Sequence, residues 1–354
     1  MARFLAEVTE EPRVMRSLVQ QYRGPMEAQL KQAAAEIVHH PVTLFTGMGS
    51  SLYASLASQY LLRACGRMAF SEEAGELLHY GSRMLSDKVG VVMISQSGSS
   101  AETCSLMRLR KETLGKAGDH GIVIVTNDQE SEMGREGANV LPLMAGEEGG
   151  TSSKTFAASL VVLTLLAEEV SGRRTPQQEF LLCFDEIENC LSYWCKEALA
   201  AVDLLRGRPN VSIIGRGSSL AAVNQAALIL SEMAKVQAMP FAGGSFRHGP
   251  LEFAGESHSA VIVAPGDETQ PLLLKLAAEL ASYGSRVWVL SDKPVIDVGG
   301  GGDNIRFTRL PHANSHLSPM VASIPLQLFA AYYAAALGYD PGVLQRCSKV
   351  TSIQ

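Results

Sequence analysis

The sequence predicts an α/β protein with two similar halves, each built on a mainly parallel β-sheet that is flanked by helices. Strand-like and helix-like segments alternate along the chain, glycine-rich turns follow short β-branched runs, and one such turn occurs twice. The 354 residues suffice for two domains of ordinary size. With 46% hydrophobic and 19% charged residues, the composition is that of a globular protein with ample core.

The repeated turn is part of a longer repeat. The turn reads GMGSSLYA at 47–54 and GRGSSLAA at 215–222. Further segments match in the same order at a nearly constant offset: 42–54 with 211–223, 74–81 with 242–249, 90–95 with 259–264, and 122–128 with 287–293. Two unrelated halves would share one Gly-x-Gly turn by chance, but not several matches in order. The pattern therefore predicts a tandem duplication of one βαβ plan.

The repeat also predicts how the chain is divided. Residues 1–40 have helical patterning and no strand signal, so we expect an N-terminal helical arm. The first domain is expected at 41–195 and the second at 196–340, with the joint near the turn sequence GRPN. A polar tail follows at 341–354.

Composition excludes several classes of partner. The net charge of −6 argues against a nucleic-acid or anionic membrane surface. The N-terminus MARFLAEVTEEPR carries acids where a signal peptide would be apolar, and the apolar stretch at 157–167 is too short to cross a bilayer. The six cysteines form no CxxC pair or zinc-like spacing, which is typical of reduced thiols. We therefore expect a cytoplasmic protein with no nucleic-acid or membrane partner.

A serine-rich loop in the first half indicates anion binding. A predicted strand, GVVMIS, leads into QSGSS and then into a helix, which places Ser95, Gln96, Ser97 and Ser100 around a helix N-terminus. Small residues let the backbone approach a ligand, and the unpaired N–H groups of the helix attract an anion. A single serine there would usually be only a helix cap. Four serines in six residues exceed that need, so we favour a phosphate-sized anion.

The second half lacks this loop and carries acid–base groups instead. Its equivalent segment, VAPGDET at 263–269, has a proline and two acids, which suit an anion poorly. Glu232 lies in a mostly apolar predicted helix, and His248 lies in FRHGP. Taken alone, each has an ordinary explanation: a solvated helix face for Glu232, and a turn-capping loop residue for His248. Together in one half, they favour proton transfer.

No metal site or cofactor is predicted. His312 and His316 in PHANSHLSP are four residues apart, but no acidic or cysteine partner has metal-ligand spacing nearby. A polar loop explains them better.

These motifs resemble those of the tandem sugar isomerase (SIS) domain family. The chain is similar to the isomerase half of glucosamine-6-phosphate synthases and to the related deglycases, which split phosphorylated sugar–amino acid adducts. The resemblance covers nearly the whole chain, through EVTEEP, GMGSS, SQSGSSAET, VTND, GGTSSKTF, GRGSSL, SEMAKV, FRHGP and SKVT. The elements SQSG and HGP, in this order, are specific to the family.

The resemblance assigns roles to individual residues. It implies a homodimer, in which Glu232 is the general acid–base group and His248 acts across the dimer interface. A tail lysine is also implied, although Lys349 stands one position later than the family's lysine. The implied substrate-binding residues are Ser51, Ser95, Gln96, Ser97 and Ser100 for the phosphate, and Ser152 and Ser153 for the sugar end.

Two departures from the synthases favour the deglycase branch. The chain has no counterpart of their glutaminase domain, and Ile229 stands where they carry a Schiff-base lysine. We therefore expect hydrolysis of a sugar–amino acid adduct to a hexose 6-phosphate and an amine, without a cofactor. An aldose–ketose isomerase, an amino-sugar phosphate deaminase and a non-catalytic phosphosugar-binding regulator remain alternatives.

Overall fold

The computed structural model describes residues 1–115, 120–293 and 302–349. Its residues group by contact into two compact units, each holding one β-sheet. We call them the first-sheet unit (Arg13–Glu148, Lys154–Leu181 and Gln345–Gln354) and the second-sheet unit (Met1–Pro12, Gly149–Ser153 and Leu182–Leu344).

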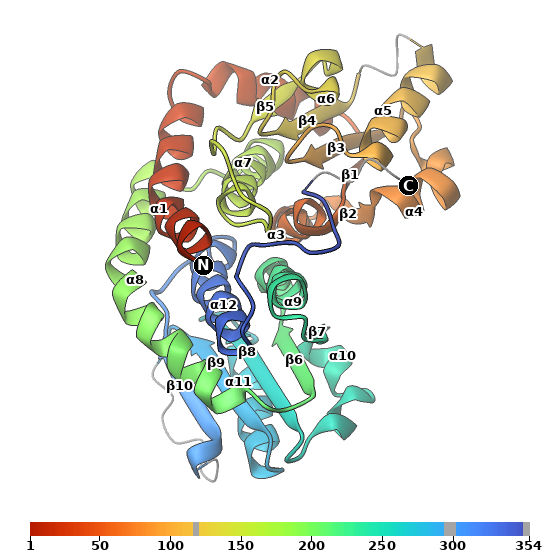
Figure 1. Cartoon of the computed structure of the whole chain (residues 1–354). Coiled ribbons are helices and arrows are strands. Elements are labelled where there is room, and N and C mark those ends of the chain that lie inside the picture. Colours follow the sequence, from red (N-terminus) through yellow and green to blue (C-terminus); the bar gives the residue numbers. More distant parts are fainter. Residues whose placement is uncertain (116–119, 294–301, 350–354) are drawn as a thin grey trace. The chain divides into compact units, whose positions relative to one another are not determined.

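The sheet of the first-sheet unit has five strands in the order β2-β1-β3-β4-β5, and all neighbouring pairs are parallel (Figure 1). Its strands β3 and β4 are rich in Val and Ile and are buried throughout, as expected when both faces are covered. The strands are β1 (Val42–Gly47), β2 (Met68–Glu73), β3 (Val89–Ser95), β4 (Ile122–Thr126) and β5 (Val140–Pro142).

Helices cover both faces of this sheet. One face packs against α4, α5 and α6 through a core that includes Leu77, Leu106 and Met133. Helices α2 and α3 contact the strands elsewhere, and α7 packs against both of these helices. The helices are α2 (Glu27–Val38), α3 (Gly49–Ala64), α4 (Ala74–Tyr80), η1 (Ser82–Met84), α5 (Ala101–Leu114), α6 (Glu132–Glu136) and α7 (Lys154–Ser171).

The second-sheet unit has the same plan. Its strands run in the order β10-β9-β8-β6-β7, with every neighbouring pair parallel (Figure 1). Read from the other end, this is the strand order of the first sheet, so the predicted fold class and the tandem duplication are confirmed. The strands are β6 (Asn210–Gly215), β7 (Ala238–Ala242), β8 (His258–Ala264), β9 (Arg286–Ser291) and β10 (Ile305–Arg309).

Helices of the second-sheet unit repeat the layering. Helices α10 and α11 share a core with the sheet, to which Phe246, Leu273 and Leu280 contribute. Helix α9 contacts β6 and β7 and packs against α12. The helices are η3 (Gly217–Ser219), α9 (Leu220–Ala234), α10 (Gly243–Phe246), η4 (Pro250–Phe253), α11 (Gln270–Ser282), η5 (Gly302–Asn304) and α12 (Ser318–Ala336).

The compact units do not follow linear boundaries. Residues 1–40 form two helices, of which α1 (Ala2–Tyr22) contributes residues to both units. Helix α8 (Gln177–Leu205) runs unbroken through the expected joint at 195/196. The segment Gly149–Ser153 groups with the second sheet although its neighbours in sequence group with the first. Of the expected tail, residues 350–354 lie outside the described residues.

Helix α12 is long and apolar enough to cross a membrane by length and composition alone. However, 83% of it is buried inside the protein, as expected for a core helix. Its ring contacts fit this position, because the ring centre of Phe329 lies 5.1 Å from the ring centre of Trp288 on β9.

His258, a buried histidine, lies at the start of β8. Its Nδ1 lies 3.1 Å from the Ser285 hydroxyl, and its Nε2 lies 3.0 Å from the Ser212 hydroxyl. The side chain of His258 is fully buried, and this burial, with a smaller effect from the Arg208 charge, lowers its pKa to about 4. The imidazole is therefore neutral at pH 7.

Candidate functional site

The serine loop follows β3 and ends where α5 begins. The Ser95 and Ser100 hydroxyls lie 3.1 Å apart, and Ser97 accepts a hydrogen bond of 3.2 Å from the Ser99 N–H. Ser100 occupies the N-cap position of α5, but its side chain makes no capping hydrogen bond. The α5 N–H groups are therefore not satisfied by the serine that a simple helix cap would use.

The loop lies at the switch point of the first sheet. From β1 the chain continues to β2 on one side, whereas β3 is followed by β4 on the other side. In open parallel sheets, ligands bind at the carboxyl ends of the two strands that flank such a point. Here these ends are Gly47 and Ser95, and Ser51 lies in the first turn of α3, the helix after β1. Ser51, Ser95, Gln96, Ser97 and Ser100 thus belong to the edge where the topology expects a ligand.

Gly98 holds the serine loop close to the next strand. Its φ is +60°, and its N–H donates to the Ser95 carbonyl. A Cβ at this position would lie 1.9 Å from the Ser131 hydroxyl and 2.8 Å from that of Thr126. Only glycine fits both the backbone conformation and the space. The positions of the serines on either side therefore depend on this residue.

The equivalent edge of the second sheet is filled by the protein's own acids. Asp267 accepts hydrogen bonds from the N–H and hydroxyl of Thr269. The Asp292 side chain, 4% exposed, accepts from the Gln270 amide and lies 2.6 Å from Nδ1 of His312. Two carboxylates at this edge would repel an anion.

Glu232 and His248 are both in the second-sheet unit. Glu232 lies in the last turn of α9 and is half-buried, rather than lying on a fully solvated face. His248 is exposed in the turn after α10. Ile229, one turn before Glu232, is fully buried among core residues. No amine is present at that place on the helix.

Ser152 and Ser153 belong to the short segment Gly149–Ser153, which groups with the second-sheet unit. The Ser153 hydroxyl donates a 3.0 Å hydrogen bond to Glu7 of α1, and the Gln225 amide of α9 donates 3.1 Å to the Ser152 carbonyl. Gln225 precedes Glu232 by seven residues, so both lie on one side of α9. The segment is therefore fixed to the helix that carries Glu232.

Lys349 is engaged by a residue that sequence reasoning did not single out. Its Nζ lies 2.6 Å from the Glu148 carboxylate, which is fully buried. Glu148 also accepts hydrogen bonds from the N–H and hydroxyl of Thr155. This ion pair fixes the described end of the tail within the first-sheet unit.

Glu7 and Glu148 are two buried acids that sequence reasoning missed. Glu7 is the first residue of EVTEEP, so the motif was recognised but the role of its glutamate was not. Glu148 directly precedes the GGTSSK segment and carries no local signal of burial. Among the residues that the structure describes, no three His, Cys, Asp or Glu side chains could hold a metal ion together.

Comparison with known proteins decides the family. The profile of the SIS domain matches residues 37–169 and again 204–337, most of the chain. The chain belongs to the SIS domain family. Its two SIS domains coincide with the two sheets described above.

Related sequences align over the whole SIS pair. This chain is 28% identical over 366 residues to a glutamine–fructose-6-phosphate aminotransferase [isomerizing] of Thermococcus kodakarensis, which covers 99% of the chain and 58% of the relative. It is 29% identical to the glutamine–fructose-6-phosphate aminotransferase [isomerizing] of Pyrococcus horikoshii, and this alignment covers 99% of the chain and 57% of the relative. The chain thus spans under two thirds of the length of these relatives.

Solved structures share the fold. The C-terminal domain of glucosamine-fructose-6-phosphate aminotransferase from Francisella tularensis aligns with a TM-score of 0.82 at 21% identity, covering 97% of this chain and 98% of that one. Tagatose-6-phosphate ketose/aldose isomerase from Escherichia coli aligns with a TM-score of 0.79 at 16% identity, covering 95% and 93%. At these identities the likeness concerns the fold of the SIS pair.

Proposed function

We propose that this SIS chain is a phosphosugar enzyme that hydrolyses a 6-phosphorylated sugar–amino acid adduct to a hexose 6-phosphate and a free amine. The observation that carries the proposal is the serine loop at the switch point of the first sheet. The loop has the hydroxyls, the glycine and the uncapped helix N-terminus that a phosphate requires. The named relatives act on sugar phosphates, which supports the same ligand class here.

Glu232 supplies the base in this proposal. From a 1-amino-1-deoxyketose 6-phosphate, its carboxylate would take a proton from C1 to give an enaminol. Return of a proton to C2 gives an imine of the aldose 6-phosphate. One water then hydrolyses the imine and releases the amine. Binding of the remote phosphate by the serine loop would help to align C1 and C2 for these steps.

His248 would open the sugar ring or move the hydroxyl proton, because an imidazole accepts and donates protons near neutral pH. We propose that it serves a second copy of the chain in a homodimer, which is supported by its exposure. Mixing two inactive variants, Glu232→Gln and His248→Ala, should then restore activity through dimers that combine one intact group from each copy. A mixture as inactive as its parts would contradict this role.

Ile229 supports hydrolysis over glutamine-dependent amination. The synthases that this chain resembles use a lysine at that place, and here a fully buried isoleucine fills it. Without an amine on α9, a Schiff base with the ketose cannot form there. Lys349 stays a proposed member of the site, paired with Glu148.

Aldose–ketose isomerisation is the second candidate, because a base that moves a proton between C1 and C2 also interconverts simple sugar phosphates. The shared fold with a ketose/aldose isomerase supports it. Amine release from phosphorylated Amadori adducts, measured beside hexose 6-phosphate isomerisation, separates the two reactions. Binding without either turnover would instead identify a regulator.

The role of Glu232 is tested by Glu232→Gln with Glu256→Gln, an exposed loop residue, as the matched control. Loss of a general base should lower kcat by about 100-fold or more while phosphosugar binding persists. The control should turn over normally. Normal turnover in Glu232→Gln would refute the assignment.

A further inference from the structure

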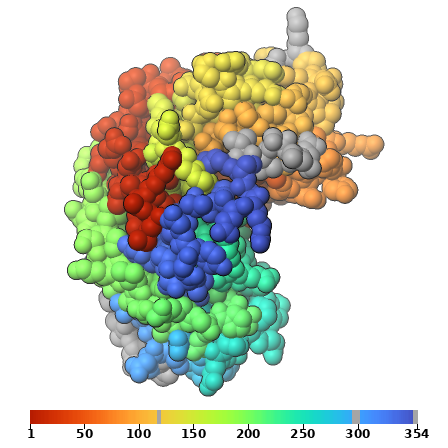
Figure 2. All heavy atoms as spheres, viewed as in Figure 1, coloured from red at the N-terminus to blue at the C-terminus, as the bar shows by residue number. Residues whose placement is uncertain are grey.

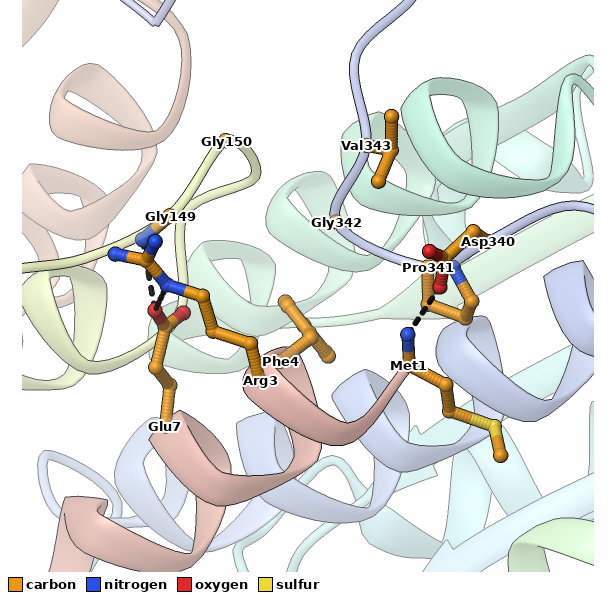
Figure 3. Close-up of a pocket in the computed structure, with 10 residues that line it drawn as sticks. All are labelled: Met1, Arg3, Phe4, Glu7, Gly149, Gly150, Asp340, Pro341, Gly342 and Val343. Atoms are coloured by element: carbon orange, nitrogen blue, oxygen red, sulfur yellow. Dashed lines mark hydrogen bonds and ion pairs between the residues drawn. The ribbon is translucent and has the colours of Figure 1, made fainter.

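A pocket of about 210 Å³ opens in the second-sheet unit. Segments far apart in the sequence line it: the start of α1, the glycines before Ser152, and the residues that follow α12 (Figure 3). Figure 2 shows the first residues (red) and the chain after α12 (blue) at the same surface. The lining residues are Met1, Arg3, Phe4, Glu7, Gly149, Gly150 and 340–343.

The pocket has a cation held in place on one side. Arg3 Nε donates a 3.1 Å hydrogen bond to Glu7, whose buried carboxylate also accepts from the Gly149 N–H at 2.7 Å. The two terminal nitrogens of Arg3 donate no hydrogen bond within the described part of the chain, and 67% of the side chain is exposed. Arg3 can therefore bind a carboxylate with both of these nitrogens.

On the opposite side of the pocket, the acidic side chain is already paired. The Asp340 carboxylate forms an ion pair with the N-terminal ammonium of Met1, and Phe4 lies between this pair and Arg3 (Figure 3). Gly150 lies against the backbone after α12, where a Cβ would come within 2.4 Å of the Gly342 carbonyl, so glycine keeps this wall open.

The pocket is continuous with the segment expected at the sugar end of the substrate. One carboxylate oxygen of Glu7 accepts a hydrogen bond from Arg3, and the other accepts one from the Ser153 hydroxyl. Ser152 is in turn held by Gln225 of α9, the helix that carries Glu232. A group bound at Arg3 therefore lies next to the segment of Ser152 and Ser153.

We propose that this pocket binds the amine portion of the adduct, and that Arg3 recognises a carboxylate on it. The inference rests on the proposed deglycase function, and it assigns the subsite and the residue that recognise the carboxylate of the amino acid. Adducts of ammonia or of a simple alkylamine lack the group that Arg3 would bind.

Matched substrates test the assignment. Two pairs of 6-phosphorylated Amadori adducts differ only in the carboxylate, which is replaced by hydrogen: glycine against methylamine, and 6-aminohexanoate against pentylamine. One pair places the carboxylate close to the linkage and the other places it far away. In the wild-type enzyme, KM should be about 10- to 100-fold lower for the carboxylate-bearing member of the pair whose length fits, the range expected for charge-assisted hydrogen bonds.

Variants of Arg3 give the second readout. Arg3→Gln should abolish the KM difference within that pair and leave the alkylamine adduct unchanged, and Arg3→Lys should keep part of the difference. Arg206→Gln is the control, because Arg206 is also an exposed arginine of this unit in an ion pair, with Asp203. Thermal unfolding checks that each variant is folded.

The outcomes separate the two proposals. Equal KM values within both pairs for the wild type, or a difference that survives Arg3→Gln, overturn the role of Arg3 while the deglycase function stands. Failure of the wild-type enzyme to release amine from any of the four adducts overturns the deglycase function, and this inference with it.

Discussion

Replacing Gly98 by alanine should damage both the stability and the phosphate affinity of the first-sheet unit. The left-handed backbone costs an alanine about 1–2 kcal/mol. The new Cβ would lie 1.9 Å from the Ser131 hydroxyl and 2.7 Å from its Cβ. Relief of such overpacking costs about 1–3 kcal/mol more. We expect Gly98→Ala to lower the free energy of unfolding by about 2–5 kcal/mol.

Gly66 provides the matched control in the same unit. It ends α3 in the left-handed conformation, with a φ of +77° and a hydrogen bond from the Arg67 N–H to the Leu62 carbonyl, and a Cβ there would meet nothing within 4 Å. Gly66→Ala should therefore cost only the backbone part, about 1–2 kcal/mol. Urea unfolding measures both values. Equal losses in the two variants would refute the steric reasoning at Gly98.

The same substitution should weaken substrate binding, because the loop must move to make room for the Cβ. A displacement of about 1 Å in a binding group can cost about 100-fold. We expect KM for a hexose 6-phosphate or its adduct to rise at least about tenfold in Gly98→Ala and to stay normal in Gly66→Ala. An unchanged KM in Gly98→Ala would show that the serine loop does not hold the phosphate.

Two further predictions concern the serine loop and the buried histidine. The double variant Ser95→Ala with Ser97→Ala should raise KM for phosphorylated substrates by about 10-fold or more, since each lost hydrogen bond to a charged group is worth about 1.5–3 kcal/mol; a normal KM would mean that the loop only starts a helix. His258 has a pKa of about 4 in the folded protein, below its ordinary value, so the unfolded chain binds the proton more readily. Its contribution to stability is complete above pH 6.5 and is lost as the pH falls toward 4, by up to about 3 kcal/mol. Urea unfolding between pH 7.5 and 4 should show this loss in the wild type and a shallower dependence in His258→Gln, and parallel curves would contradict it.

The duplication and the position of the anion loop could be predicted from local patterns. Strands such as VTLFTG and GVVMIS are short, apolar and followed by glycine or serine turns, so their ends are readable from sequence. Once both strands are parallel neighbours, their carboxyl ends must meet at one edge of the sheet. The resemblance to the SIS family implied that Ser51 and Ser95 share one phosphate site, and the strand order makes the strands that precede them, β1 and β3, neighbours.

Contacts between distant segments could not be predicted in this way. Glu7 reaches Ser153 across 146 positions, and Glu148 reaches Lys349 across 201. Neither pair has a periodicity or spacing that a local pattern could show, because a buried acid is satisfied by whatever donor the fold brings to it.

By itself, the sequence determined a repeated parallel α/β plan and a first copy that carries hydroxyls where the second carries acids, because these depend on side-chain type and on spacings of a few residues. The tertiary structure alone decided that Ser100 leaves the helix uncapped, that Asp292 and Gln270 occupy the second sheet's edge, and that Arg3 faces a pocket next to Ser153. These features depend on which elements meet in space, and packing of the whole chain sets that.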